Sequence, residues 1–242
     1  LIGWRNVYLV FGTIVILILI PVVRLIVVNT PEEIGQNKDN LETQPTSSED
    51  KKLMDVSDFF KSKLFWIISL TFAFQFLAMG GVLLHLPLHS EKIGFSETFS
   101  FLSFPIKQQV FAYSLAALGG VVGKVLFGYL VDKLSANKPV MIMMLMQALG
   151  IFGLSYVDTF LFFTISCFIF GIGFGGAMVL WSACFLKAFG SNNLGSVRGL
   201  SALVVVPLQP IGIVIVAKAF DLNLYIEAFQ LMGIVTIFAL IT

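Results

Sequence analysis

The chain has 242 residues, of which 57% are hydrophobic and 12% are charged, and its formal net charge is +1. Soluble domains average about 25% charged residues, so this chain has too few charges to cover a water-facing surface. The near-neutral balance also gives no support for a nucleic-acid partner. Long apolar segments separated by short polar breaks predict instead an integral protein of a lipid bilayer.

The chain contains about seven apolar segments that approach the roughly 20 residues a helix needs to cross the hydrocarbon core. Lipid offers the backbone no hydrogen-bond partner, so each segment is expected to be an α-helix. The runs are also too long and uninterrupted for barrel strands. The predicted fold class is therefore all-α, a polytopic membrane helix bundle with about seven transmembrane helices. The expected spans, in chain order, are 7–28, 64–88, 109–130, 140–157, 160–186, 200–220 and 225–241.

One segment, residues 29–63, is polar and rich in Glu, Asp, Lys, Ser and Thr. Such a composition buries too little apolar surface to fold alone, which predicts a largely disordered linker. The linker carries several lysines, and the positive-inside rule therefore favours a cytoplasmic location. The later loops then alternate, with the basic loops that follow the third and fifth spans on the same side as the linker.

The third expected span ends in the run Gly123-Lys124-Val-Leu-Phe-Gly128-Tyr-Leu-Val-Asp132-Lys133. This run resembles the inner-loop signature of the major facilitator superfamily, a Gly followed after three residues by Asp and a base. The resemblance implies that Gly128, Asp132 and Lys133 form a latch that holds one conformation, with the glycine allowing two helices to approach closely. The family's next glycine and arginine are replaced here by Ser135 and Ala136. The alternative is that Asp132-Lys133 is only a solvated helix end.

Further segments resemble the oxalate/formate antiporter and monocarboxylate transporter branch of that superfamily. The resemblance implies helices six to twelve of a twelve-helix transporter: 1–28 as the last helix of the N-terminal bundle, 29–63 as a cytoplasmic linker, and 64–242 as the C-terminal six-helix bundle. The chain does not begin with Met, so we expect a piece of a longer protein whose N-terminal half is missing. The stretch between Ser96 and Gly123 is longer than the family leads us to expect. The segments that carry the resemblance are 3–5, 31–35, 85–87, 94–96 and 189–195.

Lys124 is the most informative single residue. It lies eight positions before Asp132, which is about 12 Å up a helix at 1.5 Å per residue. That depth is well inside a hydrocarbon core about 30 Å thick. A lysine there is costly and normally faces a cavity, a partner or a substrate, so we expect it to bind an anionic substrate group. The alternatives are that it snorkels to the surface or pairs with an acid.

Other candidates for lining a substrate pathway are Gln75, Trp181 and Gln209, although hydrogen bonding between helices explains them equally well. His85 and His89 are four residues apart, but no H-E-x-x-H run is present and Pro87 intervenes, so no metal site is expected. The histidines are candidates for pathway lining or proton coupling, and the alternative is that they are interfacial residues at the outer mouth. The glycines between Gly171 and Gly176 follow no strand, which favours close helix packing over nucleotide binding. We expect no cofactor and no enzyme activity, since no nucleophile has a paired base. The candidate substrate-binding residues are Lys124, His85, Gln75, Trp181 and Gln209.

The function that these features favour is secondary active transport of a small organic anion, such as a mono- or dicarboxylate, by alternating access. Coupling would be by proton symport or by anion exchange, across a plasma or inner membrane. Two alternatives remain open at this point. One is a major facilitator carrier for a neutral solute or drug, and the other is a membrane receptor that kept the fold and lost transport.

Overall fold

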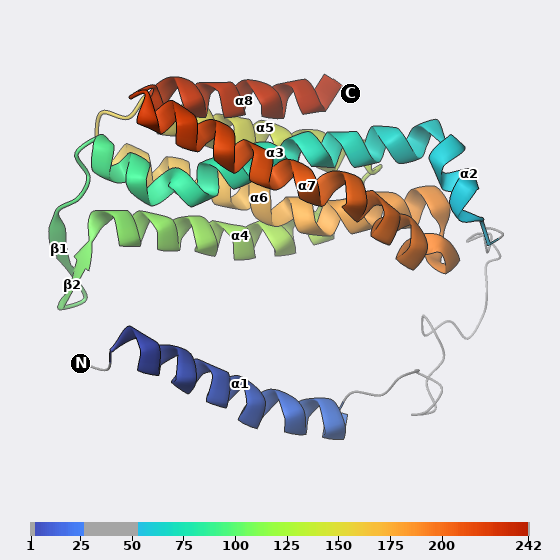
Figure 1. The fold of residues 1–242 in the computed structure, drawn as a ribbon, viewed down its shortest axis with the longest axis horizontal. Coiled ribbons are helices and arrows are strands. Elements are labelled where there is room, and N and C mark those ends of the chain that lie inside the picture. The colour runs from blue at the N-terminus through green and yellow to red at the C-terminus, as the bar shows by residue number, and fades with distance from the viewer. Residues whose placement is uncertain (1–2, 27–52, 242) are drawn as a thin grey trace. The chain divides into compact units, whose positions relative to one another are not determined.

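A computed structural model describes residues 3–26 and 53–241 of the chain, and Figure 1 shows their helices. Within these described residues, six helices are long and apolar enough to cross a membrane, and a shorter apolar helix follows them. The predicted all-α membrane bundle is thus confirmed. The helices are α1 (Trp4–Ile26), α3 (Lys63–Lys92), α4 (Gln108–Lys133), α5 (Asn137–Ser155), α6 (Phe160–Phe189), α7 (Leu194–Asp221) and α8 (Tyr225–Ile241). The helix boundaries lie within four residues of the expected spans, except that α7 begins six residues earlier.

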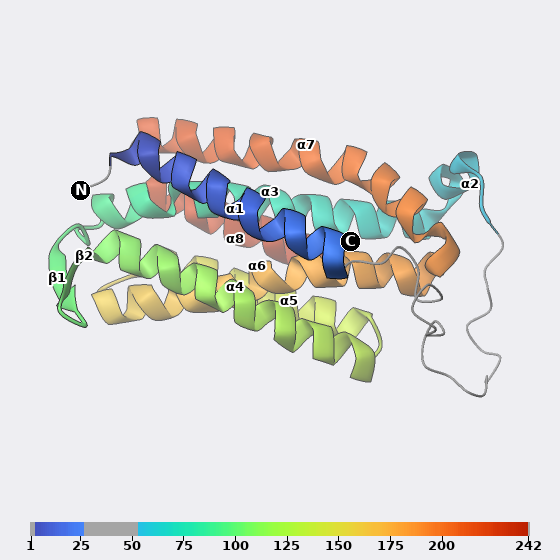
Figure 2. The same cartoon turned by 90° about the horizontal axis from the view of Figure 1, so that it is seen from below.

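The helix α1 belongs to a separate compact unit, and α3 to α8 form the other. Within the larger unit the most extensive contacts join α4 to α6, α3 to α7 and α5 to α6. The helices α3, α4 and α5 correspond in order to α6, α7 and α8. Under this correspondence the α4–α6 contact matches the α7–α3 contact. The six helices therefore contain a structural repeat of three helices, and Figure 2 shows α4, α6, α3 and α7 side by side on one face of this bundle.

Glycines set the separation between α4 and α6. A Cβ atom added at Gly123 would overlap the carbonyl oxygen of Ile172, and one added at Gly175 would overlap that of Gly120. Gly171 lies in the same way against Ala116. The obstructing atoms belong to the backbone, so the two helices are in direct backbone contact at these glycines. The predicted packing role of the glycines between Gly171 and Gly176 is confirmed.

The end of the expected linker is ordered, contrary to the sequence-based prediction. Residues Val56–Lys61 form the short helix α2, and Phe59 packs edge-to-face on Phe189 with ring centroids 5.6 Å apart. The backbone N–H of Met54 donates to Asn193 Oδ1 at 3.0 Å. The prediction of disorder is thus wrong for these residues, because Phe59 supplies the buried apolar surface that the rest of the segment lacks. Residues 29–52 of the linker lie outside the described residues.

A β-hairpin connects α3 to α4 and accounts for the extra length after Ser96. Its strands are β1 (Thr98–Phe101) and β2 (Phe104–Lys107), which pair antiparallel. The sequence predicts only helices, and the hairpin corrects that prediction for this stretch. We call the end of the bundle that carries this hairpin the hairpin end, and the opposite end, at α2, the linker end (Figure 1).

Candidate functional site

Lys124 lies on α4 next to Gly123, one of the glycines at which α4 and α6 are in contact. Gly123, the preceding residue, is buried against α6, whereas Lys124 and Val125 are exposed. Nine residues separate Lys124 from the end of α4 at Lys133, or about 13 Å along the helix axis. Within the described residues no carboxylate lies within ion-pair distance of it. The structure thus presents a lysine at membrane depth on an open part of the bundle surface.

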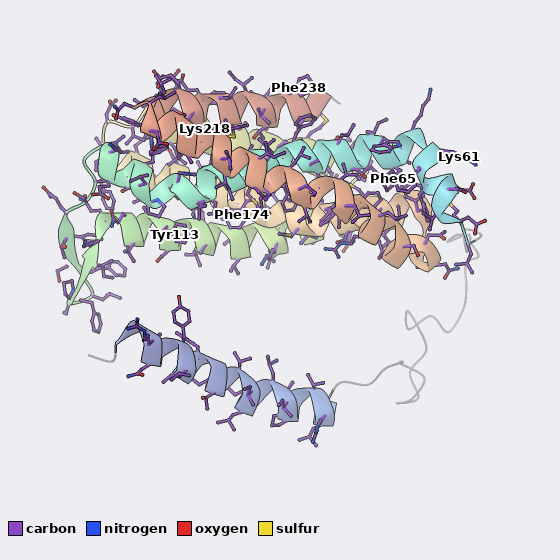
Figure 3. The ribbon with its side chains drawn as sticks, in the orientation of Figure 1. Lys61, Phe65, Tyr113, Phe174, Lys218 and Phe238 are labelled. Atoms are coloured by element: carbon purple, nitrogen blue, oxygen red, sulfur yellow. The ribbon has the colours of Figure 1, made fainter. Side chains whose placement is uncertain are left out.

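The side of α4 that carries Lys124 also carries Tyr113. Eleven residues correspond to three helical turns, so Tyr113, Ala117 and Lys124 share one side of the helix. Figure 3 labels Tyr113 on the half of α4 near the hairpin, and its side chain is 40% exposed. Sequence reasoning missed this tyrosine, although its spacing from Lys124 was enough to find it. We call Tyr113, Ala117, Lys124 and Gly128 the open flank of α4.

The latch motif lies at the linker end of the same helix. Asp132 and Lys133 are both exposed, and the Lys133 ammonium lies 5.9 Å from the centroid of the Tyr129 ring. A Cβ atom added at Gly128 would meet only Val179 Cγ1, at 4.0 Å. Close approach within this bundle therefore occurs at Gly123 and not at Gly128. The latch itself stays a prediction.

The carbonyl end of α4 has a partner that the sequence analysis did not anticipate. Lys187 Nζ, from α6, donates to the carbonyl oxygen of Val131 and, at 3.3 Å, to that of Leu134. A positive charge there stabilises the negative end of the helix dipole and satisfies carbonyls that have no partner within the helix. The position of the latch motif is thus fixed from a neighbouring helix.

Gln75 is not part of the open flank. It is fully buried, and its Nε2 donates to Gln147 Oε1 of α5 at 2.6 Å, while Gln147 Nε2 donates to the Gln75 carbonyl oxygen at 3.5 Å. Gly173 of α6 leaves the space that Gln147 occupies. The pair therefore joins α3 to α5 near the middle of the bundle. This is the hydrogen bonding between helices that the sequence left as an alternative, and a substrate role for Gln75 stays a prediction.

Trp181 belongs to a polar cluster in the linker half of the bundle. Its Nε1–H donates to Ser201 Oγ at 3.1 Å, and Ser69 Oγ donates to the same oxygen at 3.1 Å. The guanidinium carbon of Arg198 lies 5.0 Å from the centroid of the indole. The cluster joins α3, α6 and α7, and the sequence analysis did not single out its two serines or its arginine.

His85 and Gln209 lie along the contact between α3 and α7. A ring nitrogen of His85, Nδ1, donates to the Gly81 carbonyl oxygen at 2.9 Å, and the ring lies 5.3 Å from that of Phe220. Gln209 is half-buried, and its Cγ occupies the space that a Cβ at Gly80 would need. The structure does not bring either residue together with Lys124.

His89 has different neighbours from His85, although the two share a helix face. Its Nε2–H donates to the Leu154 carbonyl oxygen at 2.8 Å, and its ring stacks on Phe229 with centroids 4.1 Å apart. Across residues 3–26 and 53–241, no group of three or more His, Cys, Asp or Glu side chains is arranged to hold a metal ion.

A bundle of apolar helices with an internal three-helix repeat and an uncompensated lysine at membrane depth has the architecture of a secondary transporter. The family model of the Major Facilitator Superfamily matches residues 1–206, which is most of the chain. The chain therefore belongs to the Major Facilitator Superfamily and is a multi-pass membrane protein of the secondary transporter class. A comparison with curated proteins gave no match, and a comparison with solved structures gave none.

Proposed function

We propose that this transporter carries a small organic anion and that Lys124 binds the anionic group of the substrate. The single observation that supports the proposal most is the exposed ammonium of Lys124 within the membrane-spanning part of α4, with no carboxylate paired to it in the described bundle. The resemblance of several segments to the oxalate/formate antiporter and monocarboxylate transporter branch favours a carboxylate as that group.

The energetic argument starts from the cost of a charge in lipid. Placing a lysine near the centre of a membrane helix costs about 2.5–3.5 kcal/mol in insertion experiments. A water-filled cavity removes part of this cost, and a bound carboxylate in a medium of low dielectric constant offsets more of it. Lys124 is therefore best explained as lining the pathway. Coupling by proton symport or by exchange of two anions is compatible with one cationic site.

The open flank gives the site a shape as well as a charge. Ala117 and Gly128 lie before and after Lys124 on the same side of α4 and present little or no side chain. Tyr113, about 16 Å from Lys124 along the axis, supplies a hydroxyl nearer the hairpin end. The remaining candidates, Gln75, Trp181, His85 and Gln209, then support the packing of α3, α5, α6 and α7 around the site.

The test is uptake of labelled mono- and dicarboxylates by the intact transporter in proteoliposomes. Lys124→Gln should abolish saturable anion uptake, and Lys124→Arg, which keeps the charge but replaces a point donor by a planar fork, should retain part of it. Lys218→Gln is a matched control, because Lys218 is an exposed lysine in the last turn of α7 (Figure 3). Unchanged affinity and rate in Lys124→Gln would refute the proposed role.

We further propose that the linker end is cytoplasmic. The structure groups most basic residues of the described bundle at that end, as the positive-inside rule requires of a cytoplasmic surface. Impermeant maleimide should label cysteines placed at Lys61 and at Lys92 of the intact protein from opposite sides of the membrane, and labelling of both from outside would contradict this topology. The basic residues at the linker end are Lys61, Lys63, Lys133, Lys138, Lys187 and Arg198, and those at the hairpin end are Lys92, Lys107 and Lys218.

A further inference from the structure

The β1–β2 hairpin has one apolar face and one polar face. Cross-strand partners in an antiparallel pair project to the same side, and successive residues alternate. The register pairs Phe99 with Ile106 and Phe101 with Phe104, so these four apolar side chains form one face. The opposite face consists of Thr98, Ser100, Pro105 and Lys107.

The base of the apolar face is held by the bundle. The ring centroid of Phe99 lies 5.3 Å from that of Phe111 in α4 and 5.8 Å from that of Phe160 at the start of α6. Phe101 also contacts Phe111, with centroids 5.1 Å apart. A two-stranded hairpin alone is marginally stable in water, so this aromatic contact fixes its position on the bundle.

The tip of the apolar face is uncovered within the described unit. Phe101 is 42% exposed, Phe104 is 69% exposed, and Leu102 in the turn is 77% exposed. Leu102 and Ser103 both have positive φ angles, 49° and 70°, a conformation that hairpin turns usually assign to Asn and Gly. A leucine in this conformation, more exposed than Phe101 and Phe104, contributes little to packing inside the bundle. Its apolar side chain suits an apolar environment outside it.

The position of Phe111 on α4 identifies that environment. Thirteen residues separate Phe111 from Lys124, which places the two about 140° apart around the helix. Leu118, Val122 and Tyr129 lie on the same side as Phe111 and are exposed, and none carries a charge. This lipid strip of α4 is suited to contact acyl chains, unlike the open flank. The hairpin begins at the end of the lipid strip, and its apolar face continues it.

We propose that the hairpin is an interfacial membrane anchor. Phe101, Leu102 and Phe104 lie in the boundary between the headgroups and the acyl chains, on the membrane surface opposite the linker, and the polar face is turned to water. Figure 1 shows the hairpin running across the end of α4 instead of continuing along the helix axes, which is the orientation of an element lying in the membrane plane. The ligand is the phospholipid surface itself, and the anchor acts independently of any substrate bound at Lys124.

The test uses the intact transporter reconstituted in phosphatidylcholine vesicles. The two cysteines of the described bundle, Cys167 and Cys184, are both buried and are replaced by Ala. A bimane fluorophore is then attached at Leu102→Cys or, as a matched control on the polar face of the same hairpin, at Ser100→Cys. The first quencher is a nitroxide on a shallow acyl carbon of the lipid, and the second is aqueous iodide. Size-exclusion chromatography confirms that each labelled protein is folded.

An interfacial anchor predicts opposite responses at the two positions. The lipid nitroxide should quench bimane at Leu102 roughly threefold more than at Ser100, and iodide should show the reverse order. Equal quenching of both positions by iodide would mean that the tip lies in water. Protection of Leu102 from both quenchers would mean that protein covers it. Either of these two results overturns the proposal, and neither affects the proposed role of Lys124.

Discussion

Two glycines on α4 should respond in opposite ways to the same substitution. Gly123 lies against the backbone of Ile172, whose carbonyl oxygen, carbonyl carbon and Cα would all meet an added Cβ. Gly128 lies five residues further along the helix, and an added Cβ there would meet a single side-chain atom at ordinary contact distance. Gly123→Ala should therefore destabilise the bundle, and Gly128→Ala should not.

The magnitude follows from two opposing terms. Replacing Gly by Ala within a helix favours folding by about 1 kcal/mol, and this gain applies to both variants. At Gly123 the obstructing atoms are backbone, so α4 and α6 must separate by about 1 Å, which forfeits a quarter to a half of the dispersion energy at each contact. Overpacking of this kind costs about 1–3 kcal/mol or more, and the direct contact of Gly123 with the backbone of Ile172 places Gly123→Ala at the upper end. The expected net loss is about 2 kcal/mol.

The assay is thermal unfolding of the intact transporter in detergent, followed by size-exclusion chromatography with fluorescence detection. At about 2–4 °C per kcal/mol for a unit of this size, Gly123→Ala should lower Tm by about 4–8 °C. Gly128→Ala should leave Tm unchanged or raise it by a few degrees, and any loss of transport in that variant would then report on the latch and not on folding. Equal Tm values for the two variants would refute the packing argument.

Three other contacts give predictions of smaller size. Gln147→Leu removes the partner of the buried Gln75 amide and should cost about 1 kcal/mol, measured as a Tm lower by about 2–4 °C. Ser201→Ala leaves the Trp181 indole N–H without an acceptor and should shift the tryptophan emission of the intact protein, whereas Ser201→Thr should preserve it. Asn193→Ala removes the acceptor of the Met54 N–H, so hydrogen exchange at Met54 should accelerate while Tm changes by less than about 2 °C; unchanged exchange would contradict the docking of α2.

Most of the fold was accessible from composition, because a membrane span has a length and an apolarity that few other structures share. The boundaries of α8 coincide with the predicted span, and α4 begins one residue before and ends three residues after its predicted span. The hairpin was missed for two physical reasons. Its strands are four residues long, and its turn uses Leu102 and Ser103 where the usual Asn-Gly pattern would have marked it. The buried contact of Phe59 was equally invisible, because it depends on a residue, Phe189, far along the chain.

The candidate site was accessible only in part, since a membrane helix is apolar on nearly every side and its pattern does not show which side faces protein. The distance of Lys124 from the end of its predicted span was enough to identify it as a charge deep in the membrane. Position within the span did not show whether Gln75 lines the pathway or bonds to another helix. Its partner, Gln147, lies on α5. Trp181 was selected for its amphipathic ring, and the serine that accepts its hydrogen bond became apparent only when α6 and α7 were placed side by side.

The two exposed sides of α4, the lipid strip and the open flank, carry different residues, and this difference indicates different neighbours. If lipid surrounded the whole exposed surface of this helix, Lys124 would bear the full cost of a charge in hydrocarbon, because no acid of the described bundle lies within ion-pair distance of it. The strip from Phe111 to Tyr129, which we propose contacts lipid, presents apolar and aromatic side chains without a charge. The open flank carries a cation instead, with the small residues Ala117 and Gly128 on the same side, which favours a polar or charged neighbour. The aromatic base of the hairpin sits on the first side and leaves the second free. An element that anchored α4 in the membrane interface would thus fix the height of Lys124 without entering the pathway that the lysine lines.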